Sequence, residues 1–181
     1  MKKVLAVVTL LAVINCIQAQ VVPNSNTSPS SVSGVNAVPS AYNSTMKVNF
    51  IRTWDATKPY TSESDVINSG RTLQEVKQGT AYFDGLGRSL QTVVKKASPG
   101  GRDLVTMNIY DEFGREQFSY MPYVAIDSNT NNGLFKRNPF AEQASFYGNS
   151  TYNPGLSGEQ VYYSKAMFEA SPLGRVDTAF A

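Results

Sequence analysis

The chain has 181 residues, with 16 lysines and arginines against 14 aspartates and glutamates, and it has no histidine. This near balance of charge excludes the clustered basic excess that binds a nucleic-acid backbone. The lack of histidine excludes Ser–His and Cys–His nucleophile pairs and histidine-ligated zinc.

Residues 1–19 have the pattern of a cleavable signal peptide. Lys2 and Lys3 form a positively charged start, residues 4–14 are almost entirely apolar, and Ala19 is the small residue that precedes a cleavage site. The apolar run is much shorter than the roughly 20 residues that a membrane span requires. We therefore predict cleavage after Ala19, export to the cell surface or the medium, and no membrane span once the signal is removed.

Cys16 is the only cysteine, and it lies inside the predicted signal peptide. A lipoprotein signal places a small residue directly before the modified cysteine, but Asn15 stands there, so simple cleavage is favoured over lipidation. The mature chain then has no cysteine for a disulfide or a thiolate metal site. Removing two lysines also leaves 16 − 2 = 14 basic residues against 14 acidic ones. Packing must therefore stabilise the fold.

Residues 20–45 are rich in Ser, Asn and Pro. Such a stretch buries too little apolar surface to offset its conformational entropy, so we predict a disordered or extended linker. The ordered part is predicted to be one β-rich domain at residues 46–181. Its first strand is predicted at residues 46–54, where apolar and polar residues alternate. Residues 61–70 are typical of a loop, either fully irregular or with a short helical turn.

A repeated turn pattern is the most informative feature of the chain. Residues 81–88 read Ala-Tyr-Phe-Asp-Gly-Leu-Gly-Arg and residues 108–115 read Asn-Ile-Tyr-Asp-Glu-Phe-Gly-Arg. Both pass from an aromatic residue through aspartate to Gly-Arg, and the aspartates are 111 − 84 = 27 positions apart. Residues 171–175, Ser-Pro-Leu-Gly-Arg, form a looser third copy.

The chemistry of these copies is that of a tight turn. Asp84, Asp111 or Ser171 at the first position can accept a hydrogen bond from the backbone two residues on, and glycine at the fourth tolerates the left-handed conformation. The same turn is therefore predicted three times. The strands around the turns are predicted at residues 76–83, 89–95, 104–110, 116–120, 161–168 and 175–180.

One helix is predicted after Asn138, which can cap it, with Pro139 at the first helical position. Phe140, Ala144 and Tyr147 fall on one face at i, i+4 and i+7, which is typical of a core-facing stripe. The predicted fold class is thus mainly β: antiparallel hairpins in a meander, with one short helix and a disordered N-terminal linker.

The two turn patterns resemble the YD repeat of RHS-repeat proteins. Together with residues 121–124 (Met-Pro-Tyr-Val) and residues 168–175, they make residues 48–181 similar to the N-terminal domain of unknown function that precedes the repeats in many exported bacterial RHS proteins. The resemblance implies stacked hairpins that wind a β-shell, which encloses a C-terminal effector in toxin systems. Two close copies and one loose copy are too few for a shell, so we expect a truncated lead-in to further repeats.

The sequence predicts no catalytic, cofactor-binding or metal-binding residue, and hence no enzyme and no cofactor. Asp111, Glu112 and Glu116 are close in sequence, but Asp111 has a turn role and neighbouring strand residues point to opposite faces, unlike the spaced carboxylate pair of a glycosidase. Residues 127–133 loosely resemble a calcium loop but lack its second early acidic residue and its bidentate glutamate. A plain polar loop is favoured there.

Two functions from different classes follow. The first is a non-catalytic structural module, the N-terminal lead-in or cap of an exported RHS/YD-repeat protein, with downstream repeats as its partner and weak self-association through an open strand edge at residues 175–180. The second is a stand-alone secreted domain that binds carbohydrate or protein. The ten tyrosines would line a sugar-binding surface in the second case, or pack on half-buried sheets. No nucleic-acid partner is expected.

Overall fold

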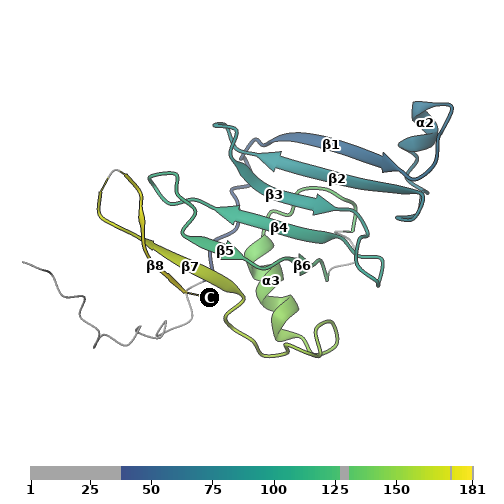
Figure 1. Ribbon diagram of the computed structural model, residues 1–181. Coiled ribbons are helices and arrows are strands. Elements are labelled where there is room, and N and C mark those ends of the chain that lie inside the picture. The colour runs from purple at the N-terminus through teal and green to yellow at the C-terminus, as the bar shows by residue number, and fades with distance from the viewer. Residues whose placement is uncertain (1–37, 127–130, 172, 181) are drawn as a thin grey trace, which may run out of the picture. The chain divides into compact units, whose positions relative to one another are not determined.

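The computed structural model of the protein describes residues 38–126, 131–171 and 173–180 (Figure 1). The predicted signal peptide, residues 1–19, lies outside the described residues. So does the predicted linker up to residue 37.

Eight strands form one antiparallel sheet. Their order is β1-β2-β3-β4-β5-β7-β8, so neighbours in the sheet are almost always neighbours in the chain, and β6 pairs with β4 beside this path. The bounds are β1 Asn49–Ala56, β2 Val76–Phe83, β3 Ser89–Val94, β4 Leu104–Ile109, β5 Phe118–Tyr120, β6 Tyr123–Val124, β7 Tyr163–Phe168 and β8 Val176–Phe180. The predicted fold class, a mainly β antiparallel meander with a short helix, is confirmed.

Most strands lie within their predicted ranges, and β2 has the predicted bounds. β1 differs, because it begins at Asn49 rather than at residue 46. The chain before it turns, with the Met46 N–H donating to the Asn43 carbonyl, and therefore cannot yet pair with β2. Phe50, one of the alternating apolar residues of this strand, is exposed. β1 is an edge strand, and the centroid of the Phe50 ring lies 6.0 Å from that of the buried Tyr82.

Of two small elements, β6 was not predicted, and α2 (Glu63–Val66) matches the short helical turn that was one alternative for residues 61–70. β6 is only two residues long, too short for an alternating pattern to reveal it. The predicted loop at residues 61–70 contains α2, Glu63–Val66, a single helical turn. The Ser62 hydroxyl accepts a hydrogen bond from the Asp65 N–H at the start of this turn.

The turns of the three hairpins β2–β3, β4–β5 and β7–β8 lie at the same end of the sheet (Figure 1). This follows from the strand order, because alternate strands of an antiparallel sheet run in the same direction. The pairing β5–β7 continues the sheet past the helix-containing segment, with Phe118 opposite Lys165 and Tyr120 opposite Tyr163. The repeated turns therefore form a row.

Helix α3, Pro139–Gly148, supplies the other wall of the core. Phe140 and Tyr147 are buried as predicted, and the Tyr147 ring stacks on Tyr162 with centroids 4.8 Å apart. Pro139 is in the first helical turn, but the expected cap is wrong: the Asn138 side chain makes no capping hydrogen bond. Its ψ of 54° lies outside the β region from which a cap side chain reaches the first N–H groups.

The core is unusually rich in tyrosine. The buried residues of its main cluster are Tyr82, Val93, Val105, Met107, Tyr123, Phe140, Tyr147, Tyr162 and Tyr163. Tyr42, which lies inside the predicted linker, also packs against this cluster, and its ring centroid is 5.2 Å from that of Phe135. The packed part of the chain thus includes Tyr42.

A buried ion pair fastens the segment before α3 to the sheet. Asp103, directly before β4, and Lys136 are almost completely inaccessible, and the Asp103 Oδ2 lies 2.9 Å from the Lys136 Nζ. The same carboxylate accepts hydrogen bonds from the backbone N–H groups of Lys96 and Gly133. The cost of burying the two charges is offset because both are paired and hydrogen-bonded.

Candidate functional site

The first two repeated turns have the same backbone geometry. In each turn the glycine N–H donates to the aspartate carbonyl, Gly87 to Asp84 at 3.1 Å and Gly114 to Asp111 at 2.9 Å. Gly87 and Gly114 have φ values of +81° and +78°, the left-handed conformation that favours glycine. The predicted tight turn is confirmed in both copies.

The aspartate of each turn binds three donors. The Oδ1 of Asp84 accepts hydrogen bonds from the backbone N–H groups of Leu86 and Arg88, and its Oδ2 accepts one from the Arg88 Nε at 2.7 Å. Asp111 repeats this arrangement with Phe113 and Arg115, with 2.8 Å to the Arg115 Nε. The bond from the residue two positions on was predicted, but the arginine was not.

These contacts also set the charge of the aspartates. Partial burial raises the pKa of Asp84, but hydrogen bonds from the Arg88 backbone and guanidinium and from the Leu86 N–H outweigh it, so the pKa lies below its ordinary value. The pKa of Asp111 is lowered for the same reasons. Both carboxylates are therefore ionised at neutral pH and held by their own turn.

The third turn is built on the same plan with a longer loop. Gly174 has a φ of +61°, and the Ser171 Oγ accepts a hydrogen bond from the Leu173 N–H, as predicted. The acidic residue, however, is Glu169, whose N–H donates to the Arg175 carbonyl and whose carboxylate binds the Arg175 Nε at 2.8 Å. Serine has no charge to hold an arginine, and Glu169 supplies it.

Arginines connect the turns to one another. The Arg88 guanidinium carbon lies 4.6 Å from the centroid of the Tyr110 ring, and that of Arg115 lies 4.7 Å from the Phe168 centroid. Tyr110 and Phe168 each directly precede the acidic residue of the following turn. Each arginine therefore binds the acid of its own turn and the ring of the next, an arrangement we call the arginine ladder.

The glycines of the ladder give the arginines room. A Cβ atom on Gly114 would lie 3.0 Å from the Arg88 Nη1, and one on Gly174 would lie 3.6 Å from the Arg115 Cδ. The arginine of one turn thus passes over the glycine of the next. An aromatic residue precedes an acid in Phe83-Asp84, Tyr110-Asp111 and Phe168-Glu169, so the sequence contains the repeated ring and acid but not which arginine meets which ring.

Each repeated turn also exposes an apolar residue directly before its glycine: Leu86, Phe113 and Leu173. Phe113 and Leu173 border a groove that Arg115, Phe168 and Gly174 also line. The end of the sheet that carries the repeated turns therefore exposes apolar side chains beside the arginines of the ladder.

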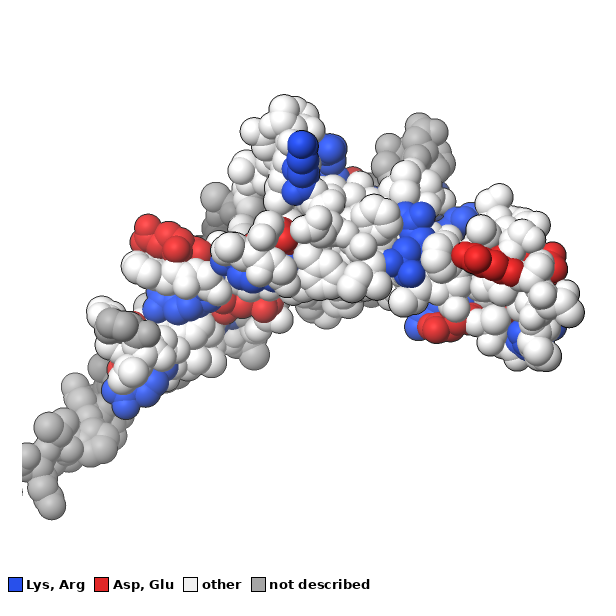
Figure 2. Space-filling view, turned by 90° about the horizontal axis from the view of Figure 1, so that it is seen from above, with Lys and Arg blue, Asp and Glu red and all other residues white. Residues whose placement is uncertain are grey.

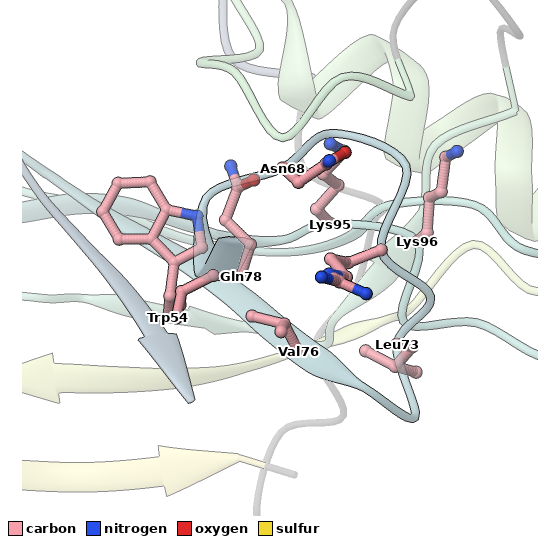
Figure 3. A pocket seen from close by; sticks show the side chains of 9 residues that line it. Trp54, Asn68, Leu73, Val76, Gln78, Lys95 and Lys96 are labelled. Carbon is pink, nitrogen blue, oxygen red and sulfur yellow. The ribbon is translucent and has the colours of Figure 1, made fainter. Parts of the chain in front are cut away.

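A separate small pocket lies at the other end of β1 and β2, beside Trp54 (Figure 3). Figure 3 shows Gln78 next to the indole, with Lys95 and Lys96 entering from the segment that follows β3. The cavity volume is about 20 Å³. That is room for a single water molecule, whereas sites for small organic ligands have volumes of about 300–1,000 Å³.

The carboxylates weighed as catalytic residues are Asp111, Glu112 and Glu116. Asp111 is occupied by its turn, and within residues 38–126, 131–171 and 173–180 no group of three His, Cys, Asp or Glu side chains is placed to hold a metal ion. Residues 127–130 of the loop that resembles a calcium loop lie outside the described residues. The described Asn131 and Asn132 side chains accept hydrogen bonds from the backbone N–H groups of Asp103 and Leu134.

The charged surface is mixed. In the view of Figure 2, lysines and arginines alternate with aspartates and glutamates, and neither sign forms a continuous patch on that face. In the part of the chain that the structure describes, no helix is both long and apolar enough to cross a bilayer.

Comparison with known proteins identifies a family. The model of the family described as "Domain of unknown function (DUF6443)" matches residues 52–181. No curated protein matches the chain significantly, and neither does any solved structure. The match begins within β1, contains all three repeated turns and extends through well over half of the chain. The chain therefore belongs to the DUF6443 family, a domain of unknown function.

Proposed function

We propose that the chain is a non-catalytic structural module, the N-terminal lead-in or cap of an exported RHS/YD-repeat protein. The arginine ladder is the observation that carries this proposal, because it joins three hairpins of one turn type by the same contact. Units that are linked to their neighbours by a repeated contact are the building principle of repeat proteins. The partner is then a series of further hairpins of the same type.

The chemistry of the turns supports a structural role. Asp84 and Asp111 are held by backbone N–H groups and by an arginine, and their pKa values lie below the ordinary value. A general acid needs the opposite shift, towards neutral pH. The three repeated residues act together: the acid binds the arginine of its own turn, and that arginine contacts the ring and passes over the glycine of the next turn.

The alternative is a self-contained secreted binding domain. The exposed Leu86, Phe113 and Leu173 favour a protein ligand for such a domain, because large apolar groups in a row are typical of interaction surfaces. The pocket beside Trp54 has room for about one water molecule and is too small for a carbohydrate, whereas the groove bordered by Phe113 and Leu173 has a volume of about 830 Å³ and is large enough for one.

The free edge of β8 separates the two functions. Among the described residues β8 pairs only with β7, so it presents backbone groups that can pair with another strand. We expect weak, concentration-dependent self-association of the chain from Gln20 to Ala181 in light scattering. Deleting the residues after Ser171 should remove it, and so should Ala179→Lys, which places a charge on the exposed edge. A strictly monomeric profile that neither change alters would favour the self-contained binding domain.

Export is the second part of the proposal, and it rests on Lys2, Lys3, the apolar run and Ala19. Cleavage by a signal peptidase after Ala19 makes Gln20 the first residue of the mature protein. N-terminal sequencing of the secreted or periplasmic protein should therefore begin at Gln20. Recovery of the chain from the cytoplasm with Met1 intact would contradict export.

A further inference from the structure

Arg175 is the third arginine of the arginine ladder, and no aromatic ring of the described residues covers it. Like Arg88 and Arg115, it binds the acidic residue of its own turn, here both oxygens of Glu169. Its side chain is 72% exposed, against 35% for Arg88 and 28% for Arg115. No ring of the described residues lies over its guanidinium, whereas the other two guanidiniums are covered by Tyr110 and Phe168.

The strand order determines which segment could cover Arg175. Arg88 adjoins the start of β3 and meets the residue after β4, and Arg115 precedes β5 and meets the last residue of β7. In both cases the ring comes from the end of the next antiparallel strand. Arg175 directly precedes β8, so the corresponding ring would come from the end of a strand that pairs antiparallel with the open edge of β8.

We propose that Arg175 and the open edge of β8 bind a further β-hairpin of defined chemistry. The first strand of this hairpin ends in an aromatic residue followed by Asp or Glu, and its turn has a left-handed glycine. The inference rests on the proposed function and specifies its partner. In this complex the planar guanidinium of Arg175 lies over the aromatic ring of the partner hairpin, while the Arg175 Nε keeps its hydrogen bond to Glu169.

The glycine is part of the requirement. At Gly114 a Cβ atom would approach the Arg88 Nη1 to 3.0 Å, which is closer than ordinary van der Waals contact. At Gly174 the distance to the Arg115 Cδ is 3.6 Å, which is ordinary contact, so what both positions share is the positive φ that favours glycine in the turn. The partner is thus defined by a ring, an acid and a glycine at fixed places.

A second copy of the chain fits this requirement less well. The other sheet edge, β1, runs in the same direction as β8, so stacking copies head to tail would pair these strands in parallel. Pairing β8 with a second β8 about a two-fold axis would bring Arg175 to the far end of the partner strand, which ends in the ring of Phe180 but has no acidic residue directly after it. A hairpin that begins with an antiparallel strand has neither mismatch.

The test uses the full chain and a backbone-cyclised peptide that copies residues 104–120, with the tyrosine of position 110 followed by aspartate. Amide exchange should show new protection of β8 when the peptide is added. Fluorescence anisotropy of labelled peptide gives the affinity. Arg175→Ala in the protein and Tyr→Leu in the peptide should each weaken binding by about 2- to 30-fold. Combining the two should weaken it no further, because both remove the same contact.

Controls separate this contact from a general effect on the fold. Arg52→Ala on β1, an arginine that lies over Phe50 at the opposite edge, should leave peptide affinity unchanged. Arg175→Lys should weaken binding less than Arg175→Ala, because lysine keeps the positive charge although it lacks the planar guanidinium group. Changing the turn glycine of the peptide to alanine should also weaken binding.

The outcomes distinguish the inference from the proposed function. If the peptide protects β8 but the losses of affinity from Arg175→Ala and from Tyr→Leu in the peptide simply add, the proposed role of Arg175 is wrong and the lead-in function still stands. Protection of β1 instead of β8, or no binding of the peptide, would overturn the inference. If β8 becomes protected in the chain alone at high concentration and Arg175→Ala abolishes that protection, a second copy is the occupant and the proposed hairpin is wrong.

Discussion

Gly87 and Gly114 are the residues on which the turn geometry depends, because both have positive φ. Valine at either position forces a β-branched residue into the left-handed region, and we expect a loss of unfolding free energy of about 1–3 kcal/mol. Alanine should cost less at Gly87, where a Cβ meets open space, than at Gly114, where it meets Arg88. Chemical denaturation measures these losses.

Gly85→Ala is the matched control, since Gly85 lies in the same turn, is not among the positive-φ glycines and has no atom near its Cβ position. Valine variants at Gly87 and Gly114 that unfold like the wild type would contradict the assigned turn.

Asp84 and Asp111 should make stability depend on acid pH. Because their pKa values are lowered in the folded protein, their stabilisation is complete above the ordinary aspartate value near pH 4 and is lost as the pH falls through the folded values. Asp84→Asn should therefore be less stable than the wild type at pH 6, and the difference should shrink towards pH 2. Urea unfolding between pH 2 and pH 6 tests this prediction.

Glu112→Gln is the control, because Glu112 lies in the second turn but outside these hydrogen bonds, and this variant should follow the wild-type curve. A difference between Asp84→Asn and the wild type that does not change with pH would contradict the lowered pKa of Asp84.

For single residues, the sequence predicted the roles that depend only on neighbours in the chain. Asp84 and Gly87 act within their own turn, so their roles can be inferred from turn preferences alone. Arg88 acts across to Tyr110 in another hairpin, and that contact depends on strand order, which no local pattern contains. The same limit explains why Glu169 was missed: it binds Arg175 from two residues before Ser171, outside the four-residue turn pattern.

Among the elements, the segment before α3 depends most on one contact, the buried pair of Asp103 and Lys136. Lys136→Met keeps the length of the side chain but leaves the Asp103 carboxylate without its cation. Leaving one member of a buried pair uncompensated costs about 3–5 kcal/mol, which equilibrium unfolding can measure. Lys77→Met, at an exposed position of β2, should change stability by less than about 0.5 kcal/mol. A loss below about 1 kcal/mol for Lys136→Met would show that the pair does not hold the segment.

The elements themselves were predicted to different degrees. The strands β2 to β5 flank turns with strong local signals, and their predicted ranges contain the observed ones. β1 was placed too early because alternation of Met46 and Val48 indicates a strand without indicating where its partner begins. Lys136 and Asp103 were not predicted as a pair, because charged residues 33 positions apart carry no pattern that brings them together.

For the whole molecule, the tyrosine core predicts a loss of stability at alkaline pH. Burial raises the pKa of Tyr42 and of Tyr120 to about 12, and it also raises the pKa of Tyr123. Tyrosines of the unfolded chain ionise near pH 10. The tyrosine contribution to the free energy of unfolding should therefore be constant up to about pH 10, and the free energy should fall between pH 10 and 12, as denaturant titrations with tyrosinate absorbance would detect.

Tyr42→Phe is the sharpest control for this prediction. The Tyr42 hydroxyl is buried and has no hydrogen-bond partner among the described residues, so its removal should not lower stability at neutral pH. The variant should also lose less stability between pH 10 and 12 than the wild type. An alkaline loss identical to that of the wild type would contradict the raised pKa of Tyr42.

The nearly sequential strand order also has a consequence for how fast the chain folds. Most strands find their partner next to them in the chain, so each hairpin closes a short loop at a small entropic cost and the sheet can grow from one hairpin to the next. Several contacts depart from this, among them Tyr82 with Gly133, 51 residues apart, Gln91 with Lys136, 45 residues apart, and Arg137 with Asn43, 94 residues apart. Closing the longest of these loops costs the most entropy, so we expect the stretch around Tyr42 and Asn43 to join the segment of Lys136 and Arg137 after the hairpins have formed.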